Sequence, residues 1–485
     1  MITPARRAFA GLALALASCT QSPPTVPPTT TRAPGAPRPM AQAPAGYVEE
    51  SRGGWTTTAL ARRSNGATAG ADDTMTTGKS LEREAAGGDG AWDAHAAGAK
   101  PMAPPAADPA GPAPAPGEAP ALRDGAPRKE ASGLTEANQA QPATPLRAGD
   151  VDDNQRWDEY LAYHHANAAL VPEAYRLDLT ERYVVEVVDR DGRFLPNARL
   201  GFAGNDKLLA EATTTSGGRT MFFPRTSPDA QGVTTFDVTV QHGTATKVVR
   251  FERKPHGSDT PWRIELDLAK PAGPVTLELV FCLDTTGSMG DEIARVQSTL
   301  LEITKKIRGL AGQPTIRYGM VLYRDLADEY VARRFGFTTD AEAFDVALKS
   351  VSANGGGDTP EALNMGLFAA VDQMPWSENA LRLVFLVADA PPHLDYADDV
   401  PFTKTIASAV ARGVKVFPTA ASGLDPQGTF CLRQIAQFTL ARFLFIEYGK
   451  DSAAGHGIGG GPVASNNLDD LVLRIVESEL GDYVK

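Results

Sequence analysis

Two almost continuous apolar runs, each ended by an aspartate, constrain the fold of this chain more than any other feature. Leu277 to Leu283 (LELVFCL) ends at Asp284, and Leu381 to Ala388 (LRLVFLVA) ends at Asp389. Such runs are typical of strands that are buried on both faces of a parallel sheet. Helical periodicity lies between them, carried by Ile293, Val296, Leu300, Ile303 and Ile307. We therefore predict an α/β, doubly wound, mostly parallel sheet over residues 275–485.

The rest of this region continues the alternation of strands and helices. Strands are expected at 317–323, 330–337, 414–420 and 443–447, and helices at 341–350, 360–374, 403–412, 429–438 and 468–480. The link between the strands 317–323 and 330–337 is short, so this pair should be antiparallel. Ligands of such folds bind at the carboxyl ends of the strands.

Polar residues stand at these predicted strand ends. The first run leads into Asp284, Thr286 and Ser288, and the second into Asp389, while a glycine-rich loop before the helix at 360–374 carries Thr359. Oxygen donors with few charges suit Mg²⁺ or Mn²⁺ that keeps some water, whereas zinc favours His and Cys. Asp358, Glu361 and His393 lie beside these residues in the sequence, and we expect them to support the site rather than to bind the ion.

These motifs resemble the von Willebrand factor A (VWA) domain with its metal-ion-dependent adhesion site. The family's Asp-x-Ser-x-Ser motif corresponds to Asp284-x-Thr286-x-Ser288, and its later Thr and Asp fall on Thr359 and Asp389. The resemblance implies that Thr286, Ser288 and Thr359 lend side-chain oxygens and that the two aspartates act mainly through water. It also implies a protein partner whose Asp or Glu carboxylate completes the ion's coordination.

Alternatives accompany this interpretation. Thr359 before Pro360 also fits a helix N-cap with proline at the first helical position. The strand ending in Asp284 is also similar to that of aspartyl-nucleophile phosphatases of the haloacid-dehalogenase type, which makes a phosphoryl-transfer hydrolase the alternative function. Their second Asp is absent at Thr286, so we expect no enzyme. Neither glycine-rich loop carries the Gly-Lys-Ser/Thr of a P-loop.

The first residues have the layout of an export signal. Arg6 and Arg7 precede an apolar run from Ala8 to Ala17, which is too short to span a bilayer. Leu16-Ala17-Ser18-Cys19 resembles a bacterial lipobox, which implies cleavage after residue 18, lipidation of Cys19 and a place in the cell envelope, on the periplasmic or surface face. An ordinary cleavable signal with an incidental Cys19 is the alternative, and the arginine pair is a partial twin-arginine match.

Between the signal and the α/β region, three further segments are expected. About half of the 37 prolines lie between residues 20 and 150, which predicts a disordered tether over 19–149. A short helical connector follows at 150–179, based on the helical spacing of Trp157, Tyr160 and Leu161. Residues 180–270 alternate short apolar runs with turns and resemble carboxypeptidase-regulatory-like β-sandwich modules. Their strands are expected at 183–188, 198–202, 220–223, 234–240, 247–251 and 262–268.

Composition excludes several classes of protein. The formal net charge of −12 argues against a nucleic-acid partner. Three cysteines in 485 residues exclude a disulfide scaffold and a cysteine-based zinc module. Cys282 and Cys431 are expected to be buried thiols, although an exported protein leaves a disulfide between them open.

Overall fold

The computed structural model describes residues 47–52, 55–60, 146–270, 273–310, 314–447, 456, 458 and 466–484. The expected signal and Cys19 lie outside these residues, as does most of the expected tether. The residues form a mixed α/β domain and a β-sandwich, as the sequence predicts, and a short helical segment precedes the sandwich in the chain.

A ten-stranded sheet forms the centre of the α/β domain, in the order β1-β2-β13-β12-β11-β14-β15-β16-β3-β17. Its core is parallel: β11 (Thr276–Asp284) lies between β12 (Thr315–Tyr323) and β14 (Ala380–Ala388), followed by β15 (Val414–Ala420) and β16 (Phe443–Ile446). β13 (Ala332–Thr338) runs antiparallel to β12, which confirms the prediction for this pair. Every residue of β14 and β15 is buried, because helices cover both faces of the sheet.

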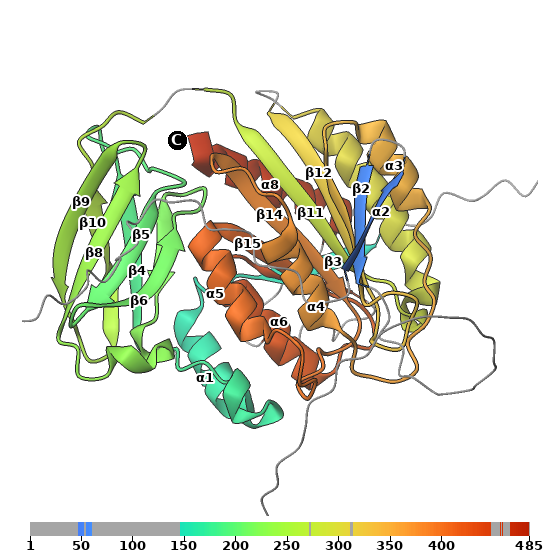
Figure 1. Ribbon diagram of the computed structural model, residues 1–485, viewed down its shortest axis with the longest axis horizontal. Helices are drawn as coiled ribbons and strands as arrows, with labels where there is room; N and C mark the ends of the chain where they lie inside the picture. The colour runs from blue at the N-terminus through green and yellow to red at the C-terminus, as the bar shows by residue number, and fades with distance from the viewer. Residues whose placement is uncertain are drawn as a thin grey trace, which may run out of the picture. The chain divides into compact units, whose positions relative to one another are not determined.

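Helices on the two faces close two separate hydrophobic cores (Figure 1). On one face lie α4 (Leu363–Phe368), α5 (Phe402–Arg412) and α6 (Pro426–Phe438). On the other face lie α2 (Gly290–Arg308), α3 (Ala341–Lys349) and α8 (Leu468–Val484). Side chains of β11 alternate between these cores, with Val280 and Cys282 on one side and Leu279, Phe281 and Leu283 on the other.

The two thiols of this domain are inert. Cys282 and Cys431 are both buried and free, so they do not form the disulfide that the sequence left open. Burial raises the pKa of each thiol far above its ordinary value.

Three strands near the two edges of the sheet come from segments that the sequence analysis assigned to the tether. β1 (Tyr47–Arg52) and β2 (Trp55–Leu60) form a hairpin whose second strand pairs with β13. β3 (Arg147–Val151) pairs antiparallel with β16, and β17 (Asn466–Asn467) pairs with β3. The expected tether boundary at residue 149 is therefore wrong, because Leu146 and Ala148 are buried in the core of the sheet domain.

One helix begins later than predicted. The segment expected as a helix at 360–374 starts at α4 with Ala362 as its N-cap, and a π-helical turn, η6 (Ala369–Gln373), continues it. Thr359 therefore does not cap this helix, since Glu361 pairs with Pro392 in an isolated parallel bridge.

A connector and a sandwich precede the sheet domain in the chain. α1 (Trp157–Asn167) and the 3-10 turns η1 (Ala168–Leu170) and η2 (Glu173–Tyr175) form the connector, which confirms a helix in this region. The sandwich has one sheet of β10 (Gly257–Glu265), β4 (Arg182–Val188) and β7 (Arg219–Phe222). Its other sheet consists of β6 (Lys207–Thr213), β5 (Arg199–Gly204), β8 (Thr235–His242) and β9 (Ala245–Glu252). The sequence analysis did not predict β6.

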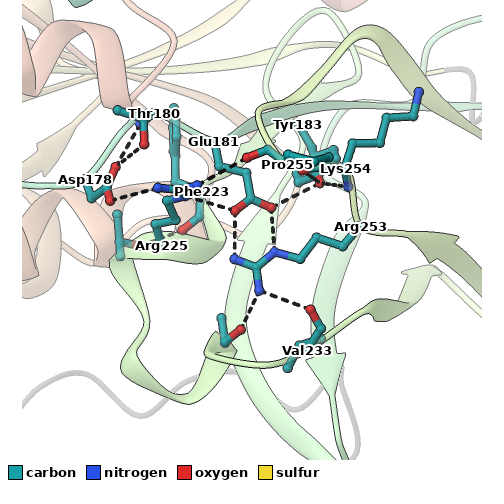
Figure 2. Close-up of polar contacts among 12 residues, drawn as sticks. Asp178, Thr180, Glu181, Tyr183, Phe223, Arg225, Val233, Arg253, Lys254 and Pro255 are labelled. Carbon is teal, nitrogen blue, oxygen red and sulfur yellow. Dashed lines mark hydrogen bonds and ion pairs between the residues drawn. The ribbon is translucent and has the colours of Figure 1, made fainter.

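A buried glutamate of the sandwich, Glu181, is held by two arginines and a tyrosine. Figure 2 shows Glu181, only 1% exposed, which accepts hydrogen bonds from Arg253 Nη2 (2.7 Å), Arg225 Nε (3.2 Å) and Tyr183 Oη (3.1 Å). Because these donors satisfy both of its oxygens, this cluster stabilises the sandwich and leaves no group for a ligand.

Candidate functional site

The end of β11 brings three of the predicted site residues together. Asp284 is the last residue of the strand and is fully buried. Its Oδ1 accepts hydrogen bonds from the backbone N–H of Thr286 (3.0 Å) and from Thr286 Oγ1 (2.7 Å). Thr286 Oγ1 lies 3.1 Å from Ser288 Oγ. Ser288 is exposed, so this row of oxygens leads from the core to the surface.

Asp389 follows the neighbouring strand β14, which pairs in parallel with β11 through Leu283 and Val387. Asp389 is 8% exposed, and its Oδ1 has no hydrogen-bond partner among the described residues. The same holds for Asp284 Oδ2. The site therefore holds two buried carboxylate oxygens that no donor of the described residues satisfies, which native structures rarely leave without a reason.

The two carboxylates influence each other. Burial, followed by the negative charge of Asp389, raises the pKa of Asp284 to about 7. Burial also raises the pKa of Asp389, and a hydrogen bond from Ser288 opposes this shift. Two acids in these surroundings favour a bound cation, because it would offset both desolvation and repulsion.

A glycine-rich loop packs directly on the β11 segment. The N–H of Gly287 donates to Gly355 O (2.8 Å), and the N–H of Asn354 donates to Thr285 O (3.0 Å). Gly356 lies so close that an added Cβ would be 3.0 Å from Thr286 Cβ. This loop leads into Asp358 and Thr359, both exposed. The structure thus places Thr359 on the loop that contacts the site, at the surface.

Glu361, which the sequence analysis expects to support the site, is buried. It is 2% exposed, and its Oε2 has no partner among the described residues. Burial raises its pKa to about 8, with smaller contributions from Asp284, Asp325, Asp328 and Asp389. Glu361 is therefore a third buried acid near the two predicted aspartate ligands.

His393 belongs to a network beside these acids. Its Nδ1 lies 2.8 Å from Asp395 Oδ1, its Nε2 lies 3.7 Å from Asp325 Oδ1, and its ring stacks on Tyr396 at 3.7 Å between centroids. The hydroxyl of Tyr396 donates to Asp325 Oδ1 (2.8 Å). His393 thus helps to hold the loop after β14 through these contacts.

Sequence reasoning missed two residues of the neighbouring β12–β13 loop. Asp328 Oδ2 accepts hydrogen bonds from the N–H groups of Gly356 (2.9 Å) and Asp325 (3.0 Å), so it holds the glycine-rich loop in place. The signal was present, since Asp325, Asp328 and Glu329 crowd into one short link at the same edge of the sheet.

The donor set fits a hard divalent cation. Within the described ranges, no three His, Cys, Asp or Glu side chains are grouped so that they could hold a metal ion, so an ion here would need hydroxyl ligands as well. Two unpaired carboxylate oxygens beside the Thr286 and Ser288 hydroxyls offer that mixture. This chemistry suits Mg²⁺ or Mn²⁺ that retains water, and it does not suit zinc.

Comparison with known proteins supports this assignment of the fold. Residues 278–416 match the von Willebrand factor A domain model. All five predicted metal-site residues lie within this VWA-like segment. VWA domains generally take part in protein–protein interaction, and the match suggests this general role for the segment 278–416.

Similar segments occur in larger proteins. A stretch of 120 residues is 28% identical to part of the alpha-protein kinase vwkA of Dictyostelium discoideum and covers 24% of this chain and 19% of the kinase. A stretch of 117 residues is 35% identical to part of human von Willebrand factor A domain-containing protein 7 and covers 24% of this chain and 12% of that protein. The chain thus spans less than a fifth of these relatives, whose activities as whole proteins do not transfer to it.

Solved structures give weaker likenesses. BatB from Bacteroides thetaiotaomicron aligns at 12% identity with a TM-score of 0.30, covering 43% of this chain and 99% of that one. The pilus adhesin SpaC from Lactobacillus rhamnosus GG aligns at 12% identity with a TM-score of 0.30, covering 52% of this chain and 33% of the SpaC chain. These likenesses carry no argument about function. Among the helices of the described ranges, none is long and apolar enough to cross a membrane.

Proposed function

We propose that the VWA-like domain is a protein-binding module that holds Mg²⁺ or Mn²⁺ with Asp284, Thr286, Ser288, Thr359 and Asp389. The observation that supports this most is a pair of buried oxygens at adjacent strand ends, Asp284 Oδ2 and Asp389 Oδ1, that have no partner among the described residues. Only two of the five residues carry a charge and the other three offer neutral hydroxyl oxygens, so a bound divalent ion would stay electrophilic and keep an open position for a carboxylate from the partner.

The residues of the proposed site have different roles. Thr286 engages Asp284 Oδ1 and leaves Oδ2 for the cation. Ser288 and Thr359 are exposed and stand where a partner has access. Glu361 is a further buried acid whose Oε2 has no partner among the described residues, and a bound cation would favour its ionised form.

The second part of the proposal concerns location. A lipid on Cys19 would anchor the chain in a bacterial cell envelope, and the proline-rich segment after it would hold the binding domain away from the membrane. This part rests on the sequence of residues 1–149, including the lipobox-like Leu16-Ala17-Ser18-Cys19.

A calorimetric Mg²⁺ titration of the chain, with Asp284→Ala beside the parent, tests the metal site. We expect Mg²⁺ to stabilise the parent by about 2.7 kcal/mol at a hundredfold excess over its dissociation constant. Asp284→Ala should remove this response. Glu302→Ala is the matched control, because Glu302 is an exposed acid on α2 that pairs with Lys305. Equal responses of the parent and Asp284→Ala would contradict the proposed site.

Partner binding is tested by capture from envelope extract with and without EDTA. Proteins retained by the parent in Mg²⁺ should be released by EDTA and should not be retained by Asp284→Ala. If Asp284 instead acts as a phosphoryl acceptor, the parent would form a beryllofluoride adduct and turn over a phosphoester, and that result would replace the binding proposal.

A further inference from the structure

A cavity lies at the end of the sheet opposite the predicted metal site. Its volume is about 450 Å³, within the range of small-molecule sites. The sandwich lines it from β4 and β7, and the α/β domain lines it from α8 and from the residues that begin β15 and β16. Lys415 is the second residue of β15 and Arg442 directly precedes β16, so this cavity lies at the amino ends of those strands.

Most charged groups of the cavity already have partners. Lys415 Nζ lies 2.5 Å from Glu479 Oε1, and the Ser216 hydroxyl of the sandwich donates to the other oxygen of Glu479. Arg442 pairs with Asp150 at 2.9 Å. Arg219 pairs with Glu186 at 2.7 Å. In each of these ion pairs a positive side chain is paired with a negative one.

Two arginines of the cavity lining, one from each domain, differ from these paired groups. Within the described part of the chain, neither Arg182 on β4 nor Arg474 on α8 forms an ion pair with a carboxylate. Arg182 lies over the ring of Trp157, 3.9 Å from its centroid, so its guanidinium is held in one place. Burial lowers the pKa of Arg182, and Asp259 and Asp158 oppose this shift at longer range. A half-buried guanidinium without a paired acid lacks the interaction that usually offsets its desolvation.

We propose that this cavity binds a small ligand through a phosphate or carboxylate group held between Arg182 and Arg474. Guanidinium groups bind such oxyanions through two parallel hydrogen bonds. Leu471 and Ile475 of α8 supply an apolar wall for the rest of the ligand. The ligand would touch both the sandwich and the α/β domain, and this site does not depend on the proposed metal site.

Calorimetric titration of the chain with inorganic phosphate and, separately, with succinate tests this site at constant ionic strength. We expect saturable binding of at least one of the two anions by the parent. Arg182→Gln and Arg474→Gln should each weaken it about tenfold or more, as for the loss of a charged hydrogen bond. Arg474 is exposed, so its variant should fold normally. The anion that binds more tightly identifies the ligand group.

Two controls separate this site from general charge effects and from the metal site. Arg250→Gln removes an arginine on β9 that pairs with Asp237 outside the cavity, and it should leave binding unchanged. EDTA and Asp284→Ala should also leave anion binding unchanged. The proposal is overturned if the parent binds neither anion saturably, or if Arg474→Gln binds as the parent does.

Discussion

The carboxylate of Asp284 has two oxygens in different situations. Oδ1 accepts two hydrogen bonds from Thr286, while Oδ2 is buried without a partner among the described residues. A group that served only the fold would tend to have both oxygens paired or exposed to water. This asymmetry is the local observation that supports the proposed cation site.

Gly356 offers a residue-scale test of how the glycine-rich loop supports that site. Its φ is +68°, and an added Cβ would lie 2.8 Å from Glu361 Oε1. Gly356→Ala should destabilise the domain by about 1 kcal/mol or more through the left-handed backbone and weaken Mg²⁺ binding. Gly357→Ala is the control, because an added Cβ there meets no atom within 4 Å. Equal Mg²⁺ affinities of the two variants by calorimetry would show that the loop does not position the site.

The ionised side chain of Asp189 in the sandwich should make the free energy of unfolding depend on pH. Burial alone would raise its pKa, but hydrogen bonds from the N–H groups of Lys270 and Arg193 lower it to about 2. A carboxylate whose pKa is lower in the folded state stabilises the fold above its unfolded pKa, and this stability is lost as the pH falls through the folded pKa.

The measurement is urea unfolding at pH 7 and at pH 3 for the parent and Asp189→Asn. We expect the variant to be less stable at pH 7 and the gap to narrow at pH 3. A gap of the same size at both pH values would contradict the role of the Asp189 charge.

At the scale of elements, one buried ion pair attaches the connector to α6. Arg433 Nε and Nη2 lie 3.0 and 2.6 Å from the two oxygens of Asp153, and both side chains are almost fully buried. The Arg433 guanidinium also lies 3.8 Å from the ring centroid of Tyr163 on α1. The connector is thus part of the packed structure.

Asp153→Ala should destabilise the chain by about 3–5 kcal/mol, because it leaves the buried Arg433 charge without its partner. Asp237→Ala removes an equally close pair with Arg250 on exposed strands, and it should cost about 0–1 kcal/mol. Chemical denaturation of both variants checks this difference. Similar losses would mean that burial does not determine the strength of these pairs.

At the scale of the whole molecule, the chain combines an expected anchor with a binding domain. If Cys19 is lipidated, Cys19→Ser should abolish acyl labelling and move the protein from the membrane fraction to the soluble fraction. A variant at Ser18 that keeps a small residue, Ser18→Ala, is the control and should fractionate as the parent does. Membrane association of Cys19→Ser equal to that of the parent would refute the lipid anchor.

Much of the fold follows from local sequence patterns. The apolar runs at β11 and β14 and the periodicity of α2 specify buried strands and an amphipathic helix, because each is defined by neighbours in the sequence. Asp284, Thr286 and Ser288 were predicted as a group for the same reason, since one tight turn contains them.

Other features depend on tertiary contacts. β6 (KLLAEAT) is built largely from residues that favour helices, yet it forms a strand because Asn205 and Asp206 adopt positive φ in a tight hairpin with β5. β3 lies at the end of a proline- and alanine-rich segment and becomes a strand by pairing with β16, almost three hundred residues later, and with β17. The contact of Asp328 with Gly356 likewise joins two loops.

The sequence by itself determined the alternation of strands and helices, the two aspartates at strand ends and the segment that matches VWA domains, because these are short-range patterns. Only the tertiary structure decided that Glu361 is buried near both aspartates, that Thr359 is not a helix cap, and that Arg182 and Arg474 line one cavity. Burial and pairing depend on which distant segments come together, and no local pattern contains that information.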